Sequence, residues 1–202
     1  MKQLESPLNK PLRMNLDKVD VPYTTDASVI LDLPIPQALW TVNPRRLLGK
    51  KWWDVIRKKV YQRNNGFCLA CGSDGRMEAH ERYVYDLENH ISTFKEVIPL
   101  CNKCHLFIHW RGVDNLNKRR TILIHGMNLL KANHLYIPEL AFRAAGIYKI
   151  GFKTKLYITD EIKESLNHPD WKLDIRPLQL TEKQIALIKK TDAYVLGKLI
   201  IE

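Results

Sequence analysis

The sequence predicts an α+β fold, and three observations support this. Apolar residues recur at spacings of three and four between residues 45 and 61, which is the pattern of an amphipathic helix. Strand-forming residues gather at 83–85 and again at 96–100, which favours a pair of strands. Helical patterns return beyond residue 112. With 202 residues, 45% of them apolar, the chain is not disordered by composition and is long enough to bury a core.

The chain divides into three regions on this pattern. Residues 1–44 are punctuated by prolines and hold only short apolar runs, so we expect an N-terminal arm with one strand at 29–33. Residues 45–112 combine a basic helix with the motifs that carry chemistry. Residues 113–202 are expected to form a mainly helical C-terminal region, whose role the sequence does not indicate.

Several elements of the C-terminal region have readable boundaries. Helical patterns cover residues 117–134 and 137–146, and residues 147–159 alternate like a strand or a hairpin. Asp160 precedes a further helical run. Thr181 stands three residues before a glutamine, which is the spacing of a capping box, so we expect a short helix to begin there.

All four cysteines of the chain fall in two CxxC pairs. Cys68 and Cys71 stand in CLAC, and Cys101 and Cys104 stand in CNKC, with 29 residues between the pairs. Without a secretory signal pattern we expect reduced thiols, and the two-residue gap suits a metal better than disulfides. A thioredoxin-like redox pair would need a strand-to-helix context that neither pair has. We therefore expect the four thiolates to hold one structural Zn²⁺ in tetrahedral coordination.

The helix predicted at 45–61 has a strongly basic polar face. A run of this charge can contact a nucleic-acid backbone or simply face solvent. The chain carries a formal charge of +10, which favours a polyanionic partner. The apolar stripe of this helix is Trp53, Ile56 and Val60. The candidate nucleic-acid contacts on its polar face are Arg45, Arg46, Lys50, Lys51, Arg57, Lys58 and Lys59.

Three histidines lie in the segments MEAHERYVYD, between the cysteine pairs, and CNKCHLFIHW, which begins with the second pair. If the chain turns helical after the second pair, His105 and His109 are at i and i+4, so both imidazoles emerge on one face. His80 stands in a strand-forming stretch, and pairing of that strand with residues 96–100 would bring it against the helical pair. We therefore expect one divalent ion on the two helical histidines, opposite His80. Three further histidines are isolated and expected to be ordinary ones: His125, His134 and His168.

These motifs resemble the HNH endonucleases, a family of ββα-metal nucleases. The resemblance rests on CLAC, AHE and the unbroken string CNKCHLFIH, and it covers about residues 60–112. It implies a zinc-stapled ββα-metal module with flanking helices, in which the two cysteine pairs bind structural zinc. It also implies that His80 is the general base and that His105 and His109 bind a catalytic divalent ion.

The sequence departs from the family pattern at two positions. The residue before the base, usually a His or Asp ligand, is Ala79, and the Asn expected five residues before the third cysteine is Glu96. Side chains alternate along a strand, so Glu81 projects to the same side as Ala79 and is the candidate for the missing ligand. Glu78 points with His80 and is the less attractive substitute.

The resemblance implies a metal-dependent endonuclease that hydrolyses DNA phosphodiester bonds and leaves 5′-phosphate and 3′-hydroxyl ends. A neutral imidazole with a pKa near its ordinary value of about 6.5 can take a proton from water at physiological pH, which is the task expected of His80. The catalytic ion would be Mg²⁺ or Mn²⁺, with Zn²⁺ and Ni²⁺ as further options. Two alternatives stay open: a non-catalytic zinc-stabilised module that binds nucleic acid, and a structural zinc fold that mediates protein contacts.

The expected partner is DNA. No stretch approaches the roughly 18–20 apolar residues that a bilayer span requires, so we expect no membrane partner and a cytoplasmic location.

Overall fold

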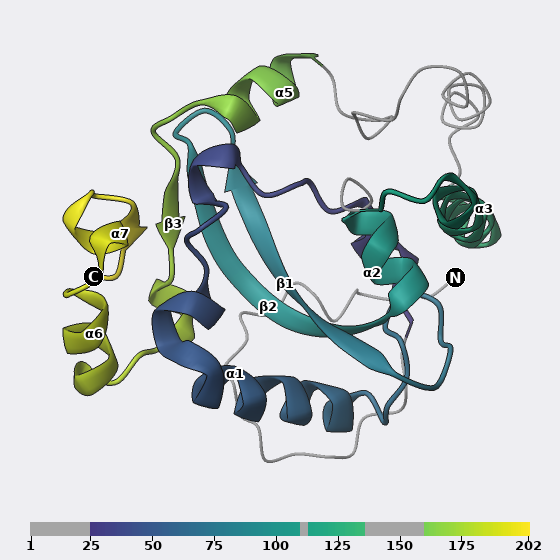
Figure 1. Cartoon of the computed structure of the whole chain (residues 1–202), viewed down its shortest axis with the longest axis horizontal. Coiled ribbons are helices and arrows are strands. Elements are labelled where there is room, and N and C mark those ends of the chain that lie inside the picture. The colour runs from purple at the N-terminus through teal and green to yellow at the C-terminus, as the bar shows by residue number, and fades with distance from the viewer. Residues whose placement is uncertain (1–24, 110–112, 136–159) are drawn as a thin grey trace, which may run out of the picture.

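A computed structural model describes residues 25–109, 113–135 and 160–202 of the chain. At its centre lies a hairpin of two long antiparallel strands, and a short helix follows the second strand without a break (Figure 1). These three elements are β1 (Met77–Asp86), β2 (Ile91–Cys101) and α2 (Asn102–Ile108).

The register of the hairpin fixes which side chains share a face. His80 pairs with Ile98, which confirms the pairing predicted with residues 96–100. An irregularity between Arg82 and Tyr83 shifts the register further along. Because side chains alternate across a strand, His80 and Arg82 lie on one face of the hairpin and Glu81 lies on the other.

Helix α1 (Pro44–Arg63) covers one of these faces. Asn43 begins the helix by accepting a backbone N–H in its first turn. Gly49 leaves helical geometry with a φ of 79°, so the helix is kinked near its start. The predicted apolar stripe is confirmed, because all three of its members are buried: Trp53, Ile56 and Val60.

The C-terminal region adds two short strands to the same sheet. β3 (Lys172–Asp174) runs parallel to β2, and β4 (Leu199–Ile200) runs parallel to β3, which gives the strand order β1-β2-β3-β4. The capping box predicted at Thr181 is present. The elements expected at 137–146 and 147–159 lie outside the described residues. Four short helical elements accompany the strands: α5 (Asp160–Asn167), the 3-10 helix η5 (Arg176–Leu178), α6 (Glu182–Ile188) and α7 (Asp192–Val195).

The described part of the N-terminal arm packs onto the rest of the molecule. The strand expected at 29–33 is wrong, because residues Ala27–Leu31 form a 3-10 helix, η2. Asp26 accepts the backbone N–H of Ser28 at 3.0 Å and so favours a tight turn over an extended strand. Val29 and Ile30 in this turn are completely buried. A second 3-10 helix, η3 (Gln37–Leu39), leads into α1.

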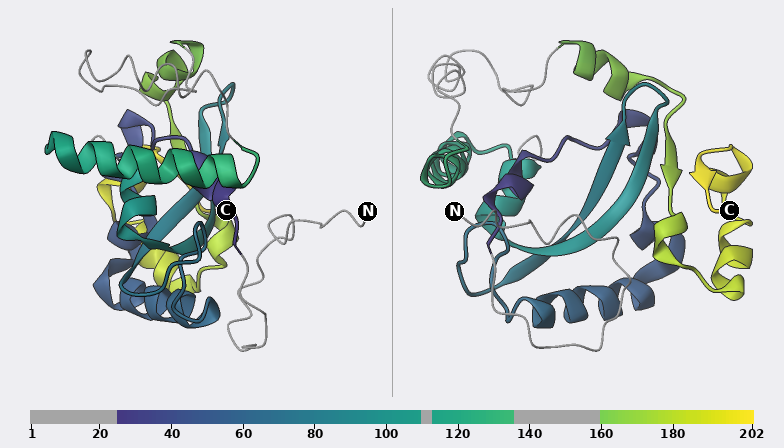
Figure 2. Two further views of the ribbon diagram at one scale, coloured as in Figure 1. Left: turned by 90° about the vertical axis from the view of Figure 1, so that its right-hand side faces the viewer. Right: turned by 180° about the vertical axis from the view of Figure 1, so that it is seen from behind.

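Helix α3 (Leu116–Ala132) confirms the helix predicted at 117–134, with ends that differ by one or two residues. It lies beside α2, on the side of the molecule away from α6 and α7 (Figure 2). At the contact, Gly126 lies directly against the ring of Phe107, with no room for a side chain.

Two hydrophobic cores lie on the two faces of the hairpin. The first combines the apolar stripe of α1 with Val97 of β2 and with Trp171 and Leu173 of the C-terminal region. The second combines Ile98 of β2 with residues of α2, η2 and α3. The face of the hairpin that carries His80 and its partner Ile98 therefore contributes to the core with α2, and α1 lies on the other side of the hairpin (Figure 1).

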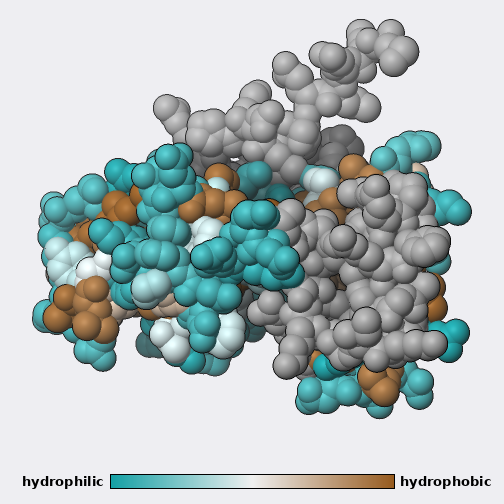
Figure 3. Space-filling model, turned by 90° about the horizontal axis from the view of Figure 1, so that it is seen from above, coloured by the Kyte–Doolittle hydropathy of each residue, from teal (hydrophilic) through white to brown (hydrophobic). Residues whose placement is uncertain are grey.

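The presence of both helices and strands confirms the predicted α+β class; that the hairpin and α2 form an HNH module stays a prediction. None of the described helices combines the length and the apolar character that crossing a membrane requires. Seen from above, hydrophilic side chains cover much of the described surface, and apolar ones form separate patches (Figure 3).

Candidate metal centres

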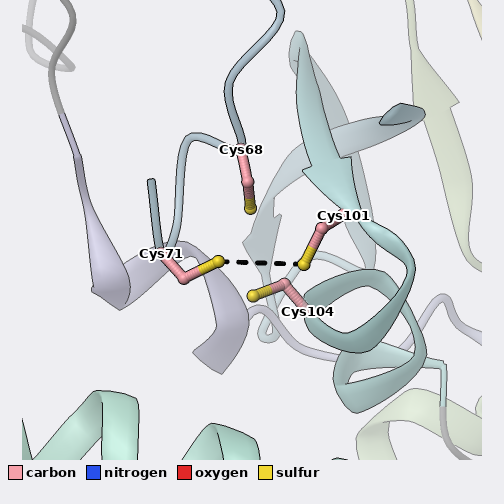
Figure 4. A group of neighbouring side chains, drawn as sticks. All are labelled: Cys68, Cys71, Cys101 and Cys104. Carbon is pink, nitrogen blue, oxygen red and sulfur yellow. Dashed lines mark hydrogen bonds between the residues drawn. The ribbon is translucent and has the colours of Figure 1, made fainter. Parts of the chain in front are cut away.

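The first candidate centre brings together all four cysteines. Cys68 and Cys71 lie in the loop after α1, Cys101 ends β2 and Cys104 lies in α2, and the four sulfurs point toward a common centre (Figure 4). All four sulfurs lie within 4.8 Å of one another, and Sγ of Cys71 is 3.7 Å from Sγ of Cys101. Sulfurs bound to one zinc ion at about 2.3 Å stand about 3.8 Å apart in a tetrahedron. The cluster can therefore hold a structural metal ion such as zinc.

Local backbone geometry explains how the two pairs converge. The backbone N–H of Gly72 donates to the carbonyl of Cys68 at 2.9 Å, and Gly72 has a φ of 73°, a conformation that glycine adopts without strain. This turn folds Cys71 back toward Cys68. At the second pair, Cys101 is the N-cap of α2, which places Cys104 within the first turn of the helix.

His125, expected to be an ordinary histidine, lies against the cysteine cluster. Packing of α3 on α2 brings its Nε2 to 3.2 Å from Sγ of Cys104. The neighbouring thiols of Cys101 and Cys71 raise the pKa of His125 to about 9, although burial acts in the opposite direction. Interactions with the other three thiols lower the pKa of Cys101, and the thiol of Cys104 makes the largest contribution. No local sequence signal points to His125, because it stands 21 residues from its cysteine partner.

The second candidate centre consists of His80, His105 and His109. One nitrogen of each ring lies within 4.8 Å of the other two. Nδ1 of His80 is 3.1 Å from Nε2 of His109, and the ring centroids of His105 and His109 are 4.8 Å apart. The structure thus brings together the three histidines that the sequence singles out, from the strand and the helix that the spacing predicts.

Glu78 is an acidic residue in contact with this cluster. Its Oε2 lies 2.5 Å from Nδ1 of His105, and its Oε1 accepts a hydrogen bond from Asn102 at 2.9 Å. Burial raises the pKa of Glu78, but the hydrogen bonds from Asn102 and His105 outweigh burial and lower it below its ordinary value. A carboxylate that accepts the Nδ1 proton leaves Nε2 of His105 as the nitrogen available to a metal.

The structure does not bring Glu81 to the histidines. Glu81 pairs with Val97, which belongs to the core beneath α1, so its side chain points away from His80. The hydroxyl of Tyr83 donates to Glu81 at 3.4 Å. Burial raises the pKa of Glu81, and the nearby backbone N–H of Arg45 at the start of α1 partly offsets this. The physical reason is the alternation of the strand, since a direct neighbour of His80 on β1 faces the opposite side.

A buried ion-pair network lies beside the histidine cluster. Arg82, only 7% exposed, donates through Nε and Nη2 to Asp32 at 2.7 and 2.9 Å and through Nη1 to Glu96 at 3.0 Å. Oδ2 of Asp32 also lies 3.8 Å from Nε2 of His80. Glu96, which stands where the family pattern has Asn, is therefore a partner of Arg82. Asp32 comes from the predicted arm, and the sequence gives no sign of its position.

The basic side chains of α1 lie across the hairpin from the histidine cluster. Asp54 accepts hydrogen bonds from Lys50 at 2.6 Å and from Arg57 at 2.8 Å, and these contacts lower the pKa of Asp54 to about 2. Lys50 and Arg57, two of the seven candidate nucleic-acid contacts, therefore share one carboxylate. The other five range from exposed to half-buried: Arg45, Arg46, Lys51, Lys58 and Lys59.

Comparisons with known proteins do not extend this picture. No protein-family model, no curated protein and no solved structure matches the chain.

Proposed function

We propose that the chain is a metal-dependent endonuclease that hydrolyses DNA phosphodiester bonds at the histidine cluster. The observation that carries the proposal is the convergence of His80 from β1 with His105 and His109, which lie in α2 and at its C-cap and closely follow the second cysteine pair in sequence. Zinc on the four cysteines would fix the junction between β2 and α2. A second divalent ion would be bound by the three histidines. The resemblance of the CxxC pairs, AHE and CNKCHLFIH to the HNH endonucleases supports this proposal.

In this proposal His80 is a metal ligand, which differs from the general-base role that the resemblance implies. Two nitrogens bound to one zinc ion at about 2.0–2.1 Å stand about 3.3 Å apart in a tetrahedron. Nδ1 of His80 and Nε2 of His109 are separated by 3.1 Å, close to that value. A base that activates water beside the ion would need space for that water and would stand further from the ligands.

The donor set favours some ions over others. Three imidazoles with further coordination positions available are typical of catalytic zinc sites and also suit Mn²⁺ and Ni²⁺. Mg²⁺ prefers oxygen ligands and fits this set least well. A divalent ion held by these three histidines would supply a Lewis acid for the phosphate and would make water a better nucleophile at neutral pH. During hydrolysis the oxygen of water would form a bond to phosphorus and lose a proton. The bond between phosphorus and the 3′ oxygen would break, and the 3′ oxygen would take up a proton.

A plasmid assay tests the proposal. Zinc-loaded protein is incubated with supercoiled plasmid and, in separate reactions, with Mg²⁺, Mn²⁺, Ni²⁺ and additional Zn²⁺. We expect relaxed and linear forms with at least one ion, and a loss of about 100-fold or more in His109→Ala. The matched control is His134→Asn, because His134 is exposed, lies outside the cluster and has a φ of 57° that asparagine tolerates.

The same assay separates the alternatives. Absence of cleavage with every ion, together with DNA binding that weakens steeply with salt, would support a non-catalytic zinc-stabilised module that binds nucleic acid. Absence of both cleavage and binding would contradict both nucleic-acid functions and favour a structural zinc fold. Cleavage that His109→Ala does not reduce would place the active site elsewhere.

A further inference from the structure

We infer that Asp32 is a positioning residue for His80, holding the imidazole in the tautomer that presents Nδ1 to a metal. The inference rests on the proposed metal centre at the histidine cluster. It starts from the 3.8 Å separation between Oδ2 of Asp32 and Nε2 of His80, the ring nitrogen opposite the one that faces His109.

Asp32 is itself held in a fixed orientation. Arg82 donates to both of its carboxylate oxygens, at 2.7 and 2.9 Å, in the two-pronged arrangement that gives arginine–carboxylate pairs their geometric specificity. The remaining nitrogen of Arg82 is anchored by Glu96 at 3.0 Å. Arg82 and Glu96 are 7% and 5% exposed, so water hardly screens these contacts. The carboxylate of Asp32 therefore has little freedom to turn away from His80.

The charge of Asp32 acts on the proton of the ring. A carboxylate beside Nε2 stabilises the neutral imidazole that carries its proton on that nitrogen and has its lone pair on Nδ1. Nδ1 is the atom that faces Nε2 of His109 at 3.1 Å. Glu78 makes a similar contact with His105, at Nδ1. Two of the three imidazoles thus have a carboxylate beside one ring nitrogen.

The position of Asp32 makes the N-terminal segment part of the centre. Asp32 follows η2 directly, and η2 is fixed by the buried side chains of Val29 and Ile30. At its start, the backbone N–H of Asp26 donates to the carbonyl of Leu69 in the first cysteine loop at 2.7 Å. This segment lies outside residues 60–112, to which the family resemblance is confined. The metal centre would therefore depend on a residue that the family motif does not contain.

A pair of matched variants tests the inference. Asp32→Asn and Asp174→Asn each remove the negative charge of a largely buried aspartate that pairs with an arginine, and each keeps an oxygen that accepts a hydrogen bond. Asp32 faces His80, whereas Asp174 lies on β3 and contacts Arg176. The cysteine cluster is loaded with Zn²⁺, and Co²⁺ is then titrated while visible absorption and heat are recorded. We expect Asp32→Asn to weaken Co²⁺ binding by about 10- to 100-fold, and Asp174→Asn to stay within a few fold of wild type. Equal weakening in both variants, or none in Asp32→Asn, would overturn the inference.

A second measurement does not depend on whether the variants fold. In ¹⁵N-labelled wild-type protein with zinc on the cysteines only, the nitrogen shifts of His80 report which ring atom is protonated. We expect a neutral ring with the proton on Nε2, and a proton on Nδ1 would contradict the role of Asp32. Neither measurement depends on DNA cleavage. If the protein cleaves no DNA but its Co²⁺ binding still depends on Asp32, the proposed function is rejected and this inference stands.

Discussion

Replacing His80 by alanine separates the two roles that this residue can have. If His80 is one of three metal ligands, its removal weakens metal binding. Structural zinc sites with four ligands bind with about 10–16 kcal/mol, or about 2.5–4 kcal/mol per ligand. One lost ligand therefore corresponds to an affinity lower by roughly 60- to 700-fold, at 1.4 kcal/mol for each tenfold step. If His80 is instead the general base, the rate falls by about 10² to 10⁴ and the metal affinity stays unchanged.

The assay measures both quantities on the same protein. Calorimetry with Mn²⁺ or Co²⁺ on zinc-loaded protein gives the affinity, and single-turnover cleavage at saturating metal gives the rate. His80 is only 5% exposed, so His80→Gln is measured in parallel as a variant that fills more of the volume of the ring. From the 3.1 Å spacing of the His80 and His109 nitrogens we expect the affinity to fall. Unchanged affinity with a slower reaction would refute the ligand assignment and restore the base.

Three further predictions test other parts of the structure. Cys101→Ser should lose the structural zinc and unfold the β2–α2 junction, which metal analysis and circular dichroism would show, and a folded variant with full zinc content would contradict the cluster. Gly126→Ala should lower the free energy of unfolding, measured in urea, by about 1–3 kcal/mol, because the added methyl meets the ring of Phe107. An unchanged or higher free energy of unfolding, as helix propensity alone predicts, would show that the ring moves aside. Combined Lys51→Ala and Lys58→Ala should weaken DNA binding on all sequences and reduce the salt slope by about 1.8, and an unchanged slope would show that this face is only solvated.

Elements with strong local periodicity could be predicted from the sequence. The stripe of α1 has one period and one buried face, so Trp53, Ile56 and Val60 are identified without knowledge of the rest of the chain. His105 and His109 are neighbours on one helix, and their convergence needs only that the helix forms. Prediction of the position of His80 depends on one tertiary contact, the pairing of its strand with residues 96–100. The register of the hairpin contains this pairing.

Residues whose role depends on tertiary contacts could not be predicted in the same way. Strand alternation favours Glu81 because it shares a face with Ala79, but that face lies against α1. Glu78, on the face of His80, contacts His105 instead. Asp32 stands 50 residues from Arg82, and a contact at that separation leaves no periodic signal. β3 and β4 span three and two residues, too short to show alternation in the sequence.

Helix α2 connects the two candidate centres physically. It has seven residues and no side-chain hydrogen bond at its N-cap, and a helix of that length is not stable alone in water. Its stability must come from packing and from the cysteines at its start, whereas His105 lies in its interior and His109 at its C-cap. A metal ion bound by the cysteines would therefore reduce the free energy required to hold the two histidines of α2 in place. Because such coupling is reciprocal, an ion bound by the histidines would also raise the affinity of the cysteines for their metal.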